Sequence, residues 1–165
     1  MQRFYWLVPG ALAGCSRPGT GAREAPTDTL SVQEALQRDL DWLRGHEIGA
    51  VLSLTEKPLD RAGVAQHGLE VLHLPVPDLT SPLPEQLSRA LHFIDSQQSF
   101  GRATAVHCLM GQGRTGSVLG AYLIRGGMPP REAIAQLRTV CPGALSVRAQ
   151  EYALHAFAAR RDWVL

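Results

Sequence analysis

The sequence predicts an α/β protein in which a central, mostly parallel sheet of about four to five strands is flanked by helices. Short apolar runs that favour strands alternate along the chain with segments of helical periodicity. One such transition, at residues 103–125, has the pattern of a strand, a glycine-rich turn and a helix. The segments after it are all helical, which adds a helical tail to the alternating part.

The first predicted element is a strand at residues 4–8 that ends in a Pro-Gly turn. The next residues, Leu12 to Cys15, also match a bacterial lipoprotein processing site, in which Cys15 would be lipidated. The basic segment before them is a single arginine and the apolar run is short, so we favour the strand and leave the second interpretation open. Residues 16–29 are rich in Pro, Gly and Thr and predict a surface loop.

Ser31 to Glu34 form a capping-box pattern that starts a helix running to about residue 44, with a leucine stripe on its core face. The later elements are predicted as a strand at 50–54, a short helix at 59–67, a strand at 69–75, a helix from Pro84, a strand at 103–106, a helix at 117–125, a helix from Pro129 to about residue 141, and a last helix at 147–160 capped by Ser146. We expect Tyr152, His155 and Phe157 of the last helix to pack in the core.

Residues 103–116, ATAVHCLMGQGRTG, are the most informative stretch. Successive backbone N–H groups can point into a common hollow at the start of a helix, and the glycines permit the backbone conformations required. The positive helix end and the Arg114 guanidinium favour a tetrahedral oxyanion there. The residues expected to bind phosphate are Leu109, Met110, Gly111, Gln112, Gly113 and Arg114.

Cys108 is the candidate nucleophile. An ordinary thiol has a pKa of about 8.5, so roughly 3% of it is thiolate at neutral pH. At a helix N-terminus beside Arg114, Cys108 should ionise more readily. A lone cysteine behind a glycine-rich turn is more often a packing residue without chemical function. Here Cys108 belongs to the pattern His-Cys-x5-Arg-Thr, which includes His107 and Thr115, and this pattern favours a chemical role. A Walker loop needs Gly-Lys-Ser/Thr, which is absent, and a dinucleotide fingerprint explains only the glycines.

We predict a two-step displacement at phosphorus in which Cys108 attacks a phosphomonoester and water then releases phosphate. Thr115 can hydrogen-bond the sulfur, and His107 is expected to order the loop from beneath. Asp78 follows a strand, at the sheet edge where active sites of α/β proteins gather, and is the candidate proton donor. Aspartate is also a common turn former, so the residues alone leave both interpretations of Asp78 open.

The totals limit the class of protein. The chain has 165 residues, 45% hydrophobic and 19% charged, with a net charge of +1, so we expect a single domain over residues 1–165 and a monomer. The charge gives no reason to expect nucleic acid or an anionic membrane as a partner. Three cysteines without paired spacing indicate a reducing compartment, and we predict the cytoplasm. We predict that Cys15 and Cys141 have no role in catalysis, although either could form a disulfide with Cys108. The histidines lack metal-ligand spacing, so no metal or cofactor is expected.

The signature at residues 107–116 resembles that of the cysteine-dependent protein tyrosine phosphatase superfamily. Segments at 4–14, 52–56, 76–78 and 138–151 extend the resemblance over nearly the whole chain to small atypical dual-specificity phosphatases, specifically the dual-specificity phosphatase 23-like group. Residues 15–35 depart from it, being longer than the usual connection. The resemblance implies a protein tyrosine phosphatase-like fold, Asp78 as general acid and Gln150 as the residue that helps to place the hydrolytic water. A solvated helix residue is the other interpretation of Gln150, and it stays open.

The resemblance also implies the substrate class, a phosphorylated protein or peptide. A shallow pocket would accept phosphotyrosine and also phosphoserine or phosphothreonine. Inositol-phosphate phosphatases of this superfamily often carry lysines in the loop, whereas Leu109, Met110 and Gln112 are uncharged. Two alternatives stay open: a small-molecule, lipid or RNA 5′-phosphatase that uses the same site, and a non-catalytic pseudophosphatase that only binds phosphate. The intact Cys108, Arg114 and Asp78 argue against the second.

Overall fold

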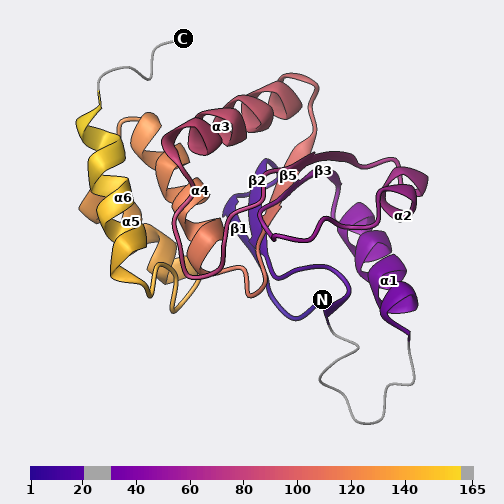
Figure 1. The fold of residues 1–165 in the computed structure, drawn as a ribbon. Coiled ribbons are helices and arrows are strands. Elements are labelled where there is room, and N and C mark those ends of the chain that lie inside the picture. The colour runs from indigo at the N-terminus through magenta and orange to yellow at the C-terminus, as the bar shows by residue number, and fades with distance from the viewer. Residues whose placement is uncertain (21–30, 161–165) are drawn as a thin grey trace.

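The sheet of the protein lies at its centre, between two layers of helices (Figure 1). The computed structural model describes residues 1–20 and 31–160. Its strands are β1 (Phe4–Val8), β2 (Leu12–Cys15), β3 (Ile48–Ser53), β4 (Glu70–His73) and β5 (Ala103–His107), in the order β1-β2-β5-β3-β4. Only the β1–β2 pair is antiparallel among the described strands, so the predicted α/β class with a mostly parallel sheet is confirmed.

Helices cover both faces of the sheet. They are α1 (Val32–Gly45), α2 (Arg61–Gln66), α3 (Pro84–Ser99), α4 (Gly113–Arg125), α5 (Pro130–Val140) and α6 (Arg148–Ala159). Helices α1 and α2 lie on one side of the sheet, and α3 to α6 lie on the other (Figure 1). A smaller apolar core therefore forms around Leu40 and Leu43, and a larger one around Leu91, Leu119 and Leu154. Within the described ranges, no helix combines the length and apolar character needed to cross a bilayer.

Parallel pairing places the carboxyl ends of β2, β3, β4 and β5 at one edge of the sheet. Since β1 runs antiparallel to β2, the amino end of β1 lies at this same edge. Loops that leave the carboxyl ends of parallel strands form the usual ligand site of an α/β fold. Cys108 follows β5 directly, so the topology alone brings this cysteine to that edge.

Two N-terminal expectations change. The Pro-Gly turn after β1 leads into a second strand, β2, which was not predicted as an element distinct from β1. Cys15 is fully buried in β2 and pairs with His107 of β5. This burial agrees with a strand at Leu12–Cys15. The predicted surface loop is wrong for residues 16–20, where Ser16, Pro18 and Gly19 are buried. Residues 21–29 of that loop lie outside the described residues.

Helix boundaries differ where backbone geometry outweighs the local pattern. The capping box of α1 is confirmed, since Ser31 and Glu34 exchange the two hydrogen bonds. Helix α4 begins at Gly113 rather than at residue 117, because the glycine-rich turn already has helical geometry there. Ser146 does not cap α6, whose N-cap residue is Val147.

The residues of α6 that pack against α4 differ in part from those that the sequence predicted. Phe157 is buried as expected, but Tyr152 is 68% exposed and His155 is also exposed, whereas Leu154 is fully buried. A Cβ added to Gly120 of α4 would lie 2.5 Å from a methyl group of Leu154. The buried stripe of α6 is therefore built on residues 150, 154 and 157, and a glycine in α4 makes room for it.

This contact predicts a matched pair of stability effects on one helix. We expect Leu154→Ala to lower the free energy of unfolding by about 2–5 kcal/mol, because it leaves a cavity against α4. We expect Tyr152→Ala to change it by about 0.5 kcal/mol or less, because that ring lies in solvent. Urea denaturation of both variants checks this, and equal losses would contradict the described packing.

Candidate active site

Cys108 lies at the base of a small cavity of about 140 Å³. The cavity wall includes Asp78, Arg114 and Gln150, together with four loop residues named in the sequence analysis: Leu109, Met110, Gln112 and Gly113. Gly111, Thr115 and His107 are not part of this wall, and both Thr115 and His107 are fully buried. The structure thus brings together, around one thiol, residues from β5, α4, α6 and the loop after β4.

The carbonyl oxygens of the loop are directed outward by hydrogen bonds from other parts of the chain. The Leu109 carbonyl accepts from the backbone N–H of Arg17 at 3.0 Å, and the Met110 carbonyl accepts from the Arg3 guanidinium at 2.7 Å. The Gly111 carbonyl accepts from the Tyr5 hydroxyl at 2.8 Å. Because C=O and the following N–H point in opposite directions in a trans peptide, the N–H groups of residues 110–112 are left to face the cavity.

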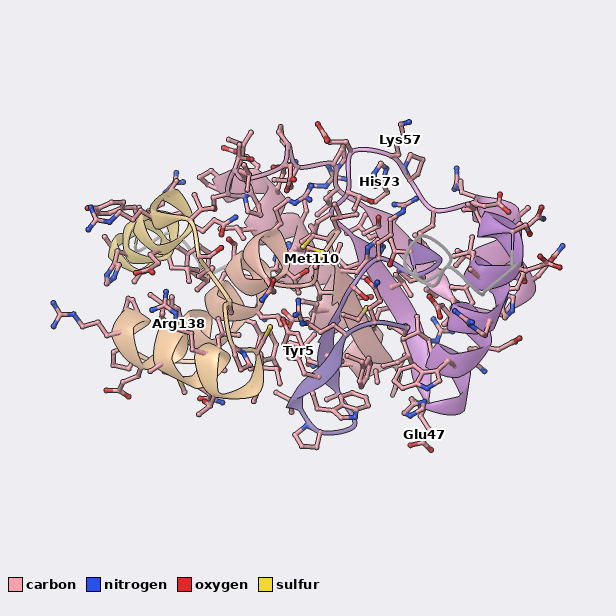
Figure 2. The ribbon with its side chains drawn as sticks, turned by 90° about the horizontal axis from the view of Figure 1, so that it is seen from below. Tyr5, Glu47, Lys57, His73, Met110 and Arg138 are labelled. Carbon is pink, nitrogen blue, oxygen red and sulfur yellow. The ribbon has the colours of Figure 1, made fainter. Side chains whose placement is uncertain are left out.

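Arg3, Tyr5 and Arg17 are residues of the candidate site that sequence analysis missed. They are far from the loop in the sequence, so no local pattern reports the contacts. Figure 2 shows Tyr5 and Met110 near each other at the centre of the molecule. One signal was available: a Cβ on Gly14 would lie 2.3 Å from the Tyr5 ring, and a glycine inside a strand often marks such a close approach.

Gly111 itself must be a glycine for two reasons. Its φ is +73°, in the left-handed region that favours glycine. An added Cβ would lie 2.5 Å from the backbone of Cys15, which cannot move without disturbing β2. The loop therefore packs directly on the end of β2, closer than any side chain would allow.

The thiol of Cys108 is 3% exposed and its pKa lies below the ordinary value. Burial is the largest influence and raises this pKa. Hydrogen bonds from the hydroxyl and N–H of Thr115, the positive charge of Arg114 and the N–H of Gly111 lower it, and together they outweigh burial. The buried Thr115 hydroxyl has no hydrogen-bond partner in the described residues, so its proton is available to the Cys108 sulfur. A thiolate at Cys108 is thus stabilised by groups that the loop and the first turn of α4 provide.

His107 is neutral because burial lowers the pKa of its imidazole to about 3. Its Nδ1 lies 3.3 Å from the Cys108 carbonyl oxygen, and its Nε2 has no partner among the described residues. The other buried cysteines behave differently from Cys108: burial raises the pKa of both the Cys15 and Cys141 thiols. All three cysteines are unbonded. The described residues also contain no cluster of side chains able to hold a metal ion.

Arg114 is 4% exposed and connects Asp78 to the loop between β5 and α4, residues 108–112, which we call the phosphate loop. Its Nη1 donates to the Val76 carbonyl at 2.9 Å, and its Nη2 lies 2.7 Å from Oδ1 of Asp78. The Asp78 oxygen also accepts the N–H of Leu79 at 3.0 Å, while its side chain stays 57% exposed. The carboxyl group is therefore oriented at the mouth of the cavity and remains accessible to a ligand.

Gln150 is buried rather than solvated, with 1% exposure. Its Nε2 donates to the Thr80 carbonyl at 3.1 Å, which ties α6 to the loop that carries Asp78. Its Oε1 has no partner among the described residues. A Cβ on Gly113 would lie 2.6 Å from the Gln150 amide, so this glycine makes room for the amide against the phosphate loop. An unpaired buried acceptor is thus placed in the wall of the cavity.

Comparison with known proteins agrees with this geometry. Residues 26–128 match a family model described as "Polymorphic toxin system, DSP-PTPase phosphatase". Dual specificity protein phosphatase CDC14AB of Danio rerio is 30% identical over 89% of this chain and 23% of that protein. Dual specificity protein phosphatase 12 of Rattus norvegicus is 33% identical over 72% of this chain and 36% of that protein. The chain thus spans about a quarter to a third of these curated relatives.

Solved structures have the same fold. The active form of Tk-PTP superimposes with a TM-score of 0.70 at 34% identity, over 75% of this chain and 86% of that one. Kinase associated phosphatase superimposes with a TM-score of 0.78 over 96% and 97% of the two chains, at 21% identity, which shows the fold alone. The resemblance to small atypical dual-specificity phosphatases is confirmed, and the narrower resemblance to the 23-like group stays a prediction. The chain belongs to the DSP-PTPase phosphatase family, as one of the small atypical dual-specificity phosphatases.

Proposed function

We propose that the chain, as one catalytic domain over residues 1–165, hydrolyses phosphotyrosine, and also phosphoserine and phosphothreonine, through a cysteinyl-phosphate intermediate. The observation that carries this proposal is the Cys108 thiol. Its pKa is lowered although the side chain is buried, and it lies at the base of a cavity walled by Arg114 and the phosphate loop. A stabilised thiolate under a ring of N–H groups suits attack on a phosphoryl group.

In the first step, the Cys108 sulfur forms a bond to phosphorus as the bond from phosphorus to the leaving oxygen breaks. Asp78 gives its proton to that oxygen. Arg114 and the loop N–H groups bind the three remaining phosphoryl oxygens through the transition state. Since Arg114 pairs with Asp78 in this structure, we infer that a bound phosphoryl group takes over part of the guanidinium and releases the carboxyl group to act as a donor.

In the second step, a water oxygen attacks phosphorus, the Asp78 carboxylate accepts its proton, and the bond between sulfur and phosphorus breaks. Gln150 supplies the unpaired Oε1 in the cavity wall, where it can accept a hydrogen bond from the attacking water. The Thr115 hydroxyl stabilises the departing Cys108 thiolate. Free phosphate leaves and the thiolate is restored, so the cycle uses no metal or cofactor.

A protein or peptide substrate fits the rim of the site better than a polyanionic lipid. Leu109 and Met110 are 42% and 48% exposed at the cavity mouth, and neither carries charge. The similar CDC14AB and phosphatase 12 proteins are named dual specificity protein phosphatases. PTPMT1 has been solved in complex with PI(5)P, but at 18% identity it shares only the fold with this chain. We place the enzyme in the cytoplasm, where a catalytic thiol stays reduced. We propose that it acts as a monomer.

The first test removes the nucleophile. We expect the wild-type protein to hydrolyse p-nitrophenyl phosphate in the presence of a chelator, and Cys108→Ser to lose at least about 10³-fold in kcat because serine is not ionised at neutral pH. Cys141→Ser is the matched control and should retain activity within about twofold, since that thiol is outside the cavity wall and a serine hydroxyl can still donate to the Gly111 carbonyl. Normal turnover by Cys108→Ser would reject the thiolate mechanism.

The lowered pKa of Cys108 predicts selective alkylation. Because iodoacetamide reacts with thiolates, its rate at Cys108 should rise with pH to a plateau whose midpoint lies below that of a free thiol. Thr115→Val should move this midpoint to higher pH by removing a hydrogen bond to the sulfur. Mass spectrometry identifies the modified residue, and inorganic phosphate should protect it. A midpoint at or above that of free cysteine would refute the stabilised thiolate.

The proposed proton donor predicts a dependence on the leaving group. We expect Asp78→Asn to lower kcat on phosphotyrosine by about 10²–10³-fold, and far less on 2,4-dinitrophenyl phosphate, whose leaving group needs no proton. Asp95→Asn is a matched control, because Asp95 is also an exposed aspartate paired with an arginine, Arg125. Equal losses on both substrates would assign Asp78 a purely structural role.

A further inference from the structure

A second and larger cavity adjoins the active site and is not used by the proposed mechanism. Its volume is about 650 Å³, and it shares Asp78, Leu109 and Arg114 with the smaller cavity. Its other walls come from residues 17–20, from α1 and from the loop after β3. A peptide that places a phosphoryl group above Cys108 therefore has room to extend into this second cavity.

Arg17 is the unusual group in its wall. Its Nη1 donates to Thr55 Oγ1 and to the Lys57 carbonyl, and its Nη2 donates to the Pro58 carbonyl. All three acceptors are neutral, and no carboxylate of the described residues pairs with this guanidinium. Three of its five N–H groups are used, so Nε–H and one Nη2–H remain. These two lie on one edge of the guanidinium and match the two oxygens of a carboxylate or phosphoryl group.

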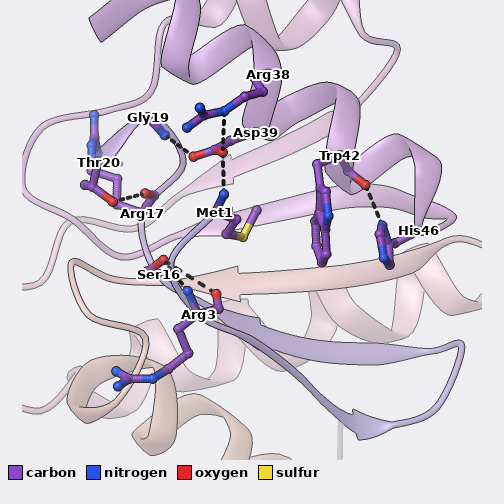
Figure 3. Close-up of polar contacts among 10 residues, drawn as sticks. All are labelled: Met1, Arg3, Ser16, Arg17, Gly19, Thr20, Arg38, Asp39, Trp42 and His46. Carbon is purple, nitrogen blue, oxygen red and sulfur yellow. Dashed lines mark hydrogen bonds and ion pairs between the residues drawn. The ribbon is translucent and has the colours of Figure 1, made fainter. Parts of the chain in front are cut away.

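The position of Arg17 is fixed before any ligand binds. Its backbone N–H donates to the Leu109 carbonyl, and its own carbonyl accepts from the Thr20 hydroxyl at 2.7 Å. The next turn is anchored by the buried Asp39 of α1, whose Oδ2 accepts the Gly19 N–H at 2.8 Å (Figure 3). A bound anion would thus meet a guanidinium that needs little further ordering.

The charge of the cavity favours one added anion. Burial lowers the pKa of the half-buried Arg17 guanidinium, because the charged form is partly removed from water. A bound anion would stabilise that charged form. Lys57 adds a second positive charge at the rim, and Figure 2 shows its side chain extending away from the protein. Glu56 is the only carboxylate of this cavity, as far as its described wall extends, that is not already paired, because Asp78 pairs with Arg114. Among the described residues of the wall, Arg17, Lys57 and Glu56 together leave a single net positive charge.

Apolar side chains make up another part of the described wall, where Val32, Leu36 and Leu59 line the same space. Such a wall suits the methylene groups of a side chain that ends in an acid. A polyanionic inositol phosphate suits it less, because the described wall has only one excess positive charge and includes the carboxylate of Glu56. The combination favours a peptide carrying a single acidic group close to the phosphorylated residue.

We propose that this cavity is a substrate-recognition site in which Arg17, assisted by Lys57, binds a second oxoanion of a phosphopeptide, either a Glu or Asp side chain or another phosphorylated residue near the one that is hydrolysed. The inference rests on the proposed phosphatase function and narrows its substrate class. Arg17 is then a specificity residue that does not touch the reacting phosphoryl group.

Binding to the Cys108→Ser protein tests this without turnover. We use a set of phosphotyrosine peptides, each with a single Glu or a single Gln at position −2, −1, +1 or +2 relative to the phosphotyrosine. Fluorescence anisotropy gives the Kd of each peptide. At the best position, we expect the Glu peptide to bind about five- to tenfold tighter than its Gln counterpart. A peptide with phosphoserine at that position distinguishes phosphate from carboxylate as the preferred second anion.

The Arg17→Gln variant in the same background should reduce this ratio to about one. Arg131→Gln is the matched control, since Arg131 is exposed on α5 and outside this cavity, and it should leave the ratio unchanged. Lys57→Glu is a second variant that spares the hydrogen bonds of Arg17, and it should lower the ratio through charge alone.

The outcomes separate the two proposals. Equal binding of Glu and Gln peptides, or a preference that survives Arg17→Gln, overturns the recognition site while wild-type hydrolysis of p-nitrophenyl phosphate still supports the phosphatase. A short-chain phosphoinositide that binds tighter than every peptide, and depends on Arg17, overturns the peptide class. Peptide preference without any hydrolysis by the wild-type protein would keep the binding site and reject the enzyme.

Discussion

The candidate site depends on hydrogen bonds that turn the carbonyl groups of residues 109–111 away from the cavity. The donors are Arg3 just before β1, Tyr5 in β1 and Arg17 after β2, so the N-terminal hairpin and the residues at its ends determine where the N–H groups of the phosphate loop point. This is possible because β1 and β2 run in opposite directions, which places the start of one strand and the end of the other at the same sheet edge. The hairpin of β1 and β2 thus contributes to the site as well as to the sheet.

A second balance acts on the sulfur at the base of the loop. Burial alone would make Cys108 as unreactive as Cys15, whose pKa it raises. What distinguishes Cys108 is its surroundings: Thr115 and the charge of Arg114 in the first turn of α4, and the N–H of Gly111 in the loop, lower its pKa. The same turn places Arg114 against Asp78, so the groups proposed to bind, attack and protonate share one short helix end and two loops.

Local features of the chain could be predicted from the sequence, and contacts between distant segments could not. The motif from His107 to Thr115 is contiguous, and the capping box at Ser31 is a local pattern, so both were identifiable. Arg3, Tyr5 and Arg17 act on residues about a hundred positions away, and their side chains carry no local signature. In α6, Tyr152 and Leu154 are only two residues apart, and which of them is buried depends on how α6 lies against Gly120 of α4.

The close fit of the Tyr5 ring over Gly14 has a consequence for how signature motifs should be interpreted. A phosphatase motif can be complete in a sequence while the scaffold that orients it has been lost, for instance through a truncated first strand or a bulky residue in place of that glycine. Inactive homologues could arise in this way with every catalytic letter intact. Surveys that judge activity by the motif alone would count such chains as enzymes.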